Sequence, residues 1–170
     1  MSRKLKVPLV EITNNTLVDP SVGDLFARNQ SLEIWGNHGR WVEANNQYLA
    51  DDVKVRLDRA KSLTNRPDKE KQHDIDQWQQ YQKHFNQLVQ IGDIAIIPVM
   101  PGLIPRKDAG PDQLLDFRQK SFRLSAISSL TGCPQIVIPI TDKNSGLTYG
   151  IGFLSTKNQD ETLLSLAKLF

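Results

Sequence analysis

The sequence predicts an α/β domain built on a mixed β-sheet that is flanked by helices. Helical periodicity gives way twice to a short β-branched run, and a glycine stands at each change, Gly92 and Gly132. Residues 135–140 are too short for a helical core and suit a pleated surface. In residues 147–154, apolar residues alternate with Thr and Gly, which predicts one apolar face and one bare face. The strands expected in the sheet are residues 94–99, 135–140, 147–154 and an edge strand near 5–12.

The first third of the chain predicts that edge strand followed by helices. Residues 5–12 contain a proline, which lacks a backbone N–H and suits an edge position. Residues 24–35 place apolar residues roughly on one helical face, and Gly36 is expected to end this helix. Residues 38–48 are expected to be irregular or a short helix. A further helix, with apolar residues recurring every four positions, is expected to begin at residue 51.

The middle of the chain predicts two longer helices around one strand. Pro67 suits the first turn of a helix with an apolar stripe and an outer face rich in Gln and Lys, and Gly92 ends it. The Pro- and Gly-rich residues 101–111 predict a loop. The helix over residues 112–130 becomes apolar nearly all round after Phe122, so its second half is expected to be buried.

Composition bounds the class of protein. The 170 residues fit one domain spanning 1–170 that is long enough to bury a core, and the net charge of +2 does not indicate nucleic-acid binding. Cys133 is the single cysteine of the sequence, which excludes an internal disulfide and fits a reducing compartment. Residues 1–10 lack the apolar core of a signal peptide, and no run is long enough to span a membrane. A cytoplasmic location is therefore expected.

Four pieces of the sequence, taken in order, resemble the C-terminal segment of amidase-signature enzymes. Residues 130–134 (Leu-Thr-Gly-Cys-Pro) follow a helix and precede the strand that contains Ile-Val-Ile-Pro at 136–139. Residues 146–152 (Gly-Leu-Thr-Tyr-Gly-Ile-Gly) resemble the family's Gly-Leu-Pro-x-Gly turn and strand. A last helix has its counterpart near 160–164, and the upstream residues 93–102 resemble a strand that ends in a Pro-rich loop.

The resemblance covers roughly residues 38–170 and is nearest to plant-type amidases and to the amidase-like receptors of the chloroplast envelope. Thr148 stands where the family usually has proline, so this turn departs from the family's pattern. The resemblance implies a fold like the C-terminal part of the amidase-signature enzymes, and an activity that hydrolyses the C–N bonds of linear amides.

The catalytic machinery that the resemblance implies has no counterpart in this sequence. Amidase-signature enzymes use a serine nucleophile, a second serine held in a cis peptide and an unprotonated lysine, and the nucleophile lies in a Gly- and Ser-rich loop. No Gly-Gly-Ser-Ser-Gly-like run occurs here. We therefore assign no catalytic residue, metal ligand or cofactor, and we expect the chain alone not to hydrolyse amides.

Several nucleophilic or ionisable residues are weaker candidates. Ser128 and Ser129 lie on a predicted helix without a neighbouring glycine, so small polar residues on a packed helix explain them better than catalysis. Lys107 and Asp108 lie in a loop, where solvated charge is the better explanation. Cys133 is better explained as a small buried apolar residue than as a nucleophile. No metal-ligand spacing joins the three histidines, which are His38, His73 and His84.

A substrate-binding wall is what the resemblance leaves for this chain to supply. It implies that the loop after residue 97 and the helix around Phe122 line an acyl-binding cavity, and the candidate residues are Pro98, Met100, Phe122 and Ser125. Amidotransferase members of the family place an acidic residue near Phe122. An aromatic residue there favours apolar or aryl-acetamide substrates over glutamine-like ones. The alternative, that Phe122 is a core residue, stays equally open.

Two functions follow from these expectations. The chain is one part of an amidase, supplying strands and a pocket wall to a longer or split enzyme, or it is a catalytically inactive amidase-like module for binding or assembly. Strands suited to burial on both faces favour the first. The same surface predicts self-association into a homo-oligomer, or pairing with a missing N-terminal half that would complete a site for a small amide. No nucleic-acid or membrane partner is expected.

Overall fold

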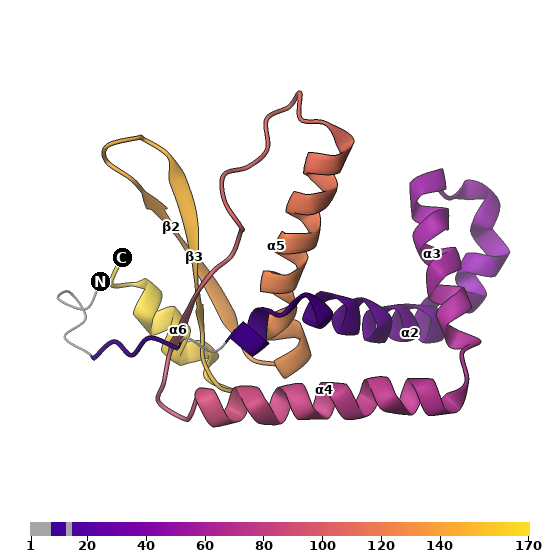
Figure 1. The fold of residues 1–170 in the computed structure, drawn as a ribbon, viewed down its shortest axis with the longest axis horizontal. Coiled ribbons are helices and arrows are strands. Elements are labelled where there is room, and N and C mark those ends of the chain that lie inside the picture. The colour runs from indigo at the N-terminus through magenta and orange to yellow at the C-terminus, as the bar shows by residue number, and fades with distance from the viewer. Residues whose placement is uncertain (1–7, 13–14) are drawn as a thin grey trace.

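The computed structural model describes residues 8–12 and 15–170, and these form a helix-rich molecule with a small sheet (Figure 1). The α/β class and the helix-flanked sheet expected from the sequence are confirmed. In chain order the elements are η1 Asn15–Val18, α2 Pro20–Asn45, η2 Asn46–Tyr48, α3 Asp51–Thr64, α4 Asp68–Leu88, β1 Ala95–Pro98, α5 Pro111–Thr131, β2 Gln135–Thr141, β3 Thr148–Leu154 and α6 Asp160–Ala167.

Helix α2 is much longer than the sequence pattern predicts. It begins where Asp19 caps it by accepting a hydrogen bond from the backbone N–H of Ser21 at 2.9 Å. The expected end at Gly36 is wrong, as is the irregular segment after it, because the helix continues through both. The reason is tertiary: α3 packs along α2, and the missing side chain of Gly39 lets the indole of Trp35 lie against the helix.

A buried carboxylate joins α4 to its neighbours. Asp74 of α4 is only 2% exposed, and its two oxygens accept hydrogen bonds from Arg28 Nε at 2.9 Å and Arg66 Nη1 at 2.8 Å. Arg28 lies on α2, and Arg66 lies in the turn between α3 and α4. Because each oxygen has a charged partner, this carboxylate is stable in the interior and fixes α4 relative to two other segments.

The C-terminal end of α5 is held by side chains of α4. The carbonyl oxygen of Leu130 accepts hydrogen bonds from the indole N–H of Trp78 and from Gln82 Nε2, the latter at 2.8 Å. Gly132 follows in the left-handed conformation, with a φ of 65°, and closes the helix as the sequence predicts. The two long helices are thereby joined through polar groups as well as apolar packing.

The sheet has three strands in the order β1-β3-β2. The predicted pairing of β2 with β3 is confirmed, with Gln135 opposite Leu154 and Thr141 opposite Thr148. Both ladders are antiparallel, so the expected mixture of parallel and antiparallel pairs is not found within the described residues. The reason is the strand order: β1 and β2 run in the same direction, but β3 lies between them.

The expected edge strand near residues 5–12 is not formed in its described part. Residues 8–12 have no regular structure, and residues 5–7 lie outside the described residues. The side chains of Leu9, Val10 and Ile12 are exposed, so none of them is buried against the sheet. Both edges of the sheet therefore lack a further strand from residues 8–12 and 15–170.

The two faces of the sheet are covered by different helices. On one face α6 packs with Leu163 against Ile138 and Phe153. On the other face the ends of α4 and α5 pack against the end of β3, with Phe85 and Ile127 at the centre. A third cluster joins α2, α4 and α5 away from the sheet. No helix in the described part of the chain is both long and apolar enough to cross a membrane.

Candidate functional site

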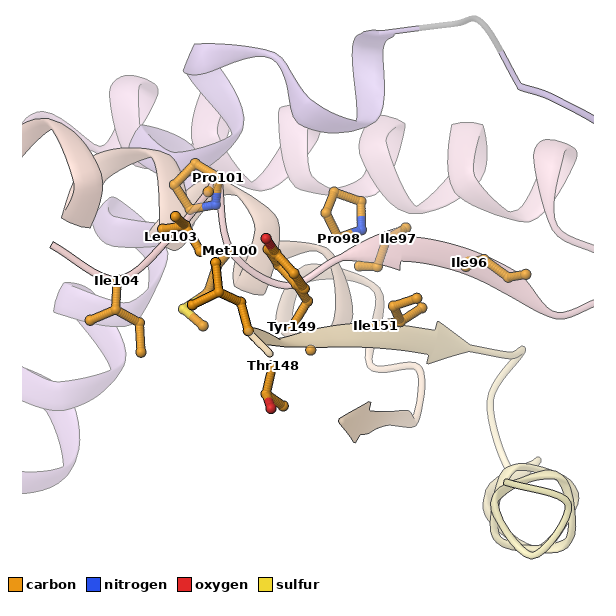
Figure 2. Close-up of a pocket in the computed structure, with 13 residues that line it drawn as sticks. Ile96, Ile97, Pro98, Met100, Pro101, Leu103, Ile104, Thr148, Tyr149 and Ile151 are labelled. Atoms are coloured by element: carbon orange, nitrogen blue, oxygen red, sulfur yellow. The ribbon is translucent and has the colours of Figure 1, made fainter. Parts of the chain in front are cut away.

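An open apolar groove lies where β1 ends and β3 begins (Figure 2). Its volume is about 580 Å³. One wall is formed by β1 and the loop that follows it, and the other by the first residues of β3. The lining residues are Ile96, Ile97, Pro98, Met100, Pro101, Gly102, Leu103, Ile104, Leu147, Thr148, Tyr149, Gly150 and Ile151.

The loop wall of the groove is held in place by close packing on two glycines of β3. A Cβ placed on Gly150 would lie 2.6 Å from Cγ2 of Val99, and one placed on Gly152 would lie 2.9 Å from Cγ1 of the same valine. The bare face predicted from the alternation in β3 is therefore occupied by a side chain of the chain itself. Glycine is required there because any larger residue would push Val99, and the loop that follows it, away from the sheet.

The groove opens where α6 no longer covers the sheet. With eight residues, α6 is long enough to pack over Phe153 and Ile138 but leaves the far end of the hairpin uncovered. Tyr149 is consequently 40% exposed, and Ile104 of the loop wall is 73% exposed. Apolar side chains exposed together in a concave surface are typical of a ligand or partner site.

The chemistry of the groove is neutral. None of its lining residues carries a charged side chain, and two carry a hydroxyl group. The hydroxyl of Thr148 is paired with that of Thr141 at 2.9 Å. The hydroxyl of Tyr149 has no hydrogen-bond partner within the described residues, and Figure 2 shows its ring rising from β3 toward the side of the groove formed by Met100 and Pro101.

The structure separates the four predicted substrate-binding residues into two pairs. Pro98 and Met100 line the groove, and their role in substrate binding stays a prediction. Phe122 and Ser125 lie on α5 and do not line it: Phe122 packs against Phe26 with ring centroids 5.0 Å apart, and the exposed Ser125 donates a hydrogen bond to the carbonyl of Phe122 at 3.1 Å.

Tyr149 and the loop residues Leu103 and Ile104 were not among the candidates from the sequence. The alternation in β3 identified the apolar face on which Tyr149 lies. It gave no indication of which end of that face α6 would leave open, because this depends on the length and docking of α6.

The residues considered weaker candidates occupy places that fit their structural explanations. Ser128 donates to the carbonyl of Ser125 at 3.4 Å, and Ser129 is exposed. Asp108 is exposed and pairs with Arg106 at 3.1 Å. Cys133 is buried among the apolar side chains at the end of β3. Among the described residues, no cluster of His, Cys, Asp or Glu has the arrangement to hold a metal ion.

A second hollow, of about 770 Å³, surrounds Asp74 at the start of α4. Its basic residues, Arg28, Arg66 and Lys69, are matched in number by acidic ones, and the arginines are already bonded to Asp74. Glu70 further binds Arg66 at 2.9 Å, and both interactions raise the pKa of that guanidinium. This network joins helices and presents no surplus charge to a ligand.

The fold and the groove together define a helix-rich α/β unit with an open, uncharged apolar groove. Comparison with family models matches residues 32–164 to the Amidase family, so the chain belongs to that family. No significant match was found among curated proteins.

Two solved structures share the fold. A structure described as the crystal structure of amidase is similar with a TM-score of 0.70 and 16% identity, over 87% of this chain and 34% of that one. Allophanate hydrolase of Kluyveromyces lactis is similar with a TM-score of 0.59 and 16% identity, over 96% of this chain and 30% of that one. The chain therefore spans about a third of the length of these proteins.

Proposed function

We propose that this chain is the part of an amidase-family hydrolase that supplies sheet strands and a wall of the substrate groove. The nucleophile and its base would come from the remainder of the fold, either in a longer polypeptide or in a separate subunit. In support, the sequence lacks a Gly- and Ser-rich nucleophile loop, and the chain spans about a third of the matched structures. The reaction would be hydrolysis of an amide C–N bond.

The observation that carries this proposal is the excess of exposed surface. The chain exposes 11983 Å², whereas a compact monomer of 19.2 kDa exposes about 8,400 Å². The nine residues outside the described part account for at most about 1,500 Å², even at the value for an unfolded chain. The remaining excess is about 2,000 Å², more than twice the roughly 800 Å² that one partner buries in an ordinary interface.

The excess includes exposed apolar side chains near the groove and on α5. All residues of 111–120 are exposed except Phe117, and Leu114 and Leu115 of this half-helix are 47% and 55% exposed. The edges of β1 and β2 are also unpaired within the described chain. Open sheet edges and apolar helix faces favour association, because both bury unpaired groups or apolar surface.

Sedimentation velocity over a wide concentration range tests this proposal. We expect the purified chain to self-associate, and we expect Leu115→Glu to weaken association because it places a charge on the exposed half of α5 at residues 111–120. Val55→Glu on α3 is the matched control, since Val55 is at least as exposed as Leu115 but lies on the α2–α3 hairpin away from the sheet. The chain alone should not hydrolyse a simple arylacetamide.

The alternative is a catalytically inactive binding or assembly module, of the kind that the amidase-like chloroplast envelope receptors represent. A chain that stays monomeric at all concentrations would favour this alternative, because a stand-alone module has no missing partner. Hydrolysis of an arylacetamide that is abolished by Ser128→Ala or Ser129→Ala would contradict both proposals. We also propose a cytoplasmic location, because a chain with a single cysteine, the buried Cys133, fits a reducing compartment.

A further inference from the structure

Two side-chain hydroxyl groups, those of Thr148 and Tyr149, lie in an otherwise apolar groove. The phenol of Tyr149 lies among aliphatic side chains and, within the described residues, its hydroxyl has no hydrogen-bond partner. The neighbouring hydroxyl of Thr148 is different, because it is already bonded to Thr141. Tyr149 therefore supplies the free side-chain hydrogen-bonding group of the groove.

The lining determines which ligands the groove accepts. An aliphatic wall of isoleucine, leucine, proline and methionine favours a hydrocarbon or aromatic group by burying apolar surface. A carboxylate or ammonium group would lose water without gaining a charged partner, because no lining residue is charged. The uncharged lining of the groove therefore favours a neutral ligand.

We propose that Tyr149 determines specificity in this groove for a neutral amide with an apolar acyl or aryl group. The apolar group lies against Ile96, Ile151 and the Leu103–Ile104 wall, and the Tyr149 O–H donates a hydrogen bond to the carbonyl oxygen of the amide. This inference deepens the proposed function, on which its choice of an amide rests. Tyr149 is a binding residue here and takes no part in bond cleavage.

Binding of three related probes tests the proposal without any catalytic step. 2-Naphthylacetamide carries the amide, 2-isobutylnaphthalene has the same shape without polar atoms, and 2-naphthylacetate carries a charge. Affinities are measured by chemical-shift titration of the ¹⁵N-labelled chain. We expect Tyr149→Phe to weaken 2-naphthylacetamide binding by about 5- to 10-fold, the effect of losing one hydrogen bond. Binding of 2-isobutylnaphthalene should change less than about 2-fold.

Tyr48→Phe is the matched control, because Tyr48 is exposed on the α2–α3 hairpin and should affect no probe. The proposal is wrong if Tyr149→Phe weakens both neutral probes equally or neither of them. It is also wrong if no probe shifts the groove residues, or if 2-naphthylacetate binds as tightly as the amide. Affinity that falls as the protein concentration rises would show that a second copy occupies the groove instead.

The outcome is separable from that of the proposed function. A selective loss of amide binding in Tyr149→Phe supports the inference even if no partner ever restores hydrolysis. Conversely, self-association through the exposed half of α5, which does not line the groove, supports the proposed function even if the groove binds none of the probes.

Discussion

Val99 packs directly over Gly150, and this contact positions the loop wall of the groove. A Cβ at residue 150 would lie 2.6 Å from Cγ2 of Val99 and 3.0 Å from Cγ1 of Val137. Valine is stiff at χ1 and cannot turn away at low cost. We expect Gly150→Ala to lower the free energy of unfolding by about 1–3 kcal/mol, measured by denaturant titration.

Gly102→Ala is the control for this substitution. Gly102 lies in the same loop wall, but no atom lies within 4 Å of the position of its Cβ and its φ is not positive. Its replacement should leave stability unchanged or raise it by a few tenths of a kcal/mol, since alanine restricts the unfolded chain. Equal losses in both variants would show that the Val99 contact does not hold the loop.

Two glycines of α2 should respond in opposite ways to alanine. Gly36 has open space around it in the middle of a helix, so Gly36→Ala should raise the free energy of unfolding by about 1 kcal/mol through helix propensity. Gly39→Ala places a Cβ 2.9 Å from the indole of Trp35, which Lys61 Nζ covers at 5.3 Å. It should destabilise the protein. Thermal unfolding of the two variants makes the comparison, and stabilisation by both would exclude close packing at Gly39.

The carboxylate of Asp74 should contribute strongly to stability. Asp74→Asn leaves two guanidiniums, with side chains 28% and 20% exposed, facing a neutral group. We expect a loss of about 2–3 kcal/mol, less than for fully buried partners because solvent still reaches both arginines. Asp52→Asn breaks an exposed pair with Arg56 and should cost less than about 0.5 kcal/mol. A loss in Asp74→Asn no larger than this control would contradict the role assigned to the network.

Two threonine hydroxyls differ in their hydrogen bonding. Oγ1 of Thr156 is buried without a partner in the described structure, so Thr156→Val removes an unsatisfied polar group and should be neutral or stabilising. Thr131 Oγ1 donates to the carbonyl of Ile127 at 2.7 Å, and Thr131→Val should cost about 1 kcal/mol. Chemical denaturation distinguishes them. A loss in Thr156→Val would indicate that water satisfies this hydroxyl.

The turn between β2 and β3 should respond to acid. The hydroxyl of Ser145 donates to Asp142 at 2.6 Å, and this bond together with the N–H of Asn144 holds the pKa of the Asp142 carboxyl below its ordinary value of 3.8. A lowered pKa means that the ionised form stabilises the turn above pH 3.8 and that this stabilisation is lost as the pH falls through the folded-state value. Ser145→Ala should move the pKa back toward 3.8 in an NMR titration, and an unchanged pKa would refute this cause.

Local patterns in the sequence predicted most of the elements, whereas tertiary contacts determined the rest. The β2–β3 hairpin follows from alternation and turn residues, which are local. The continuation of α2 through Gly36 depends on packing with α3, and no pattern within α2 indicates that packing. The antiparallel ladders likewise depend on β3 lying between β1 and β2, an arrangement set by long-range pairing.

Only the part of the candidate site that lies in one continuous loop, the loop after β1, could be predicted from the sequence. Pro98 and Met100 belong to a loop that the resemblance to the amidase-signature enzymes implied to be a wall, and both line the groove. Tyr149 falls on the apolar face that the alternation along β3 predicts, and its exposure results from where α6 ends. Phe122 lies on the same helix as buried residues and packs on Phe26, a contact between segments that periodicity does not reveal.

The two walls of the groove come from strands that are far apart along the chain, because β1 and its loop form one wall and β3 forms the other. β2 and β3 are joined by a short turn, whereas α5 and β2 separate β1 from β3 along the chain. Closing the longer segment costs more chain entropy, so we expect β1 to join the sheet last and to leave it first. Backbone amides of β1 should therefore exchange with solvent faster than those shared by β2 and β3. Any ligand that contacts both walls of the groove would slow hydrogen exchange in β1, because it would stabilise the pairing of this edge strand with β3.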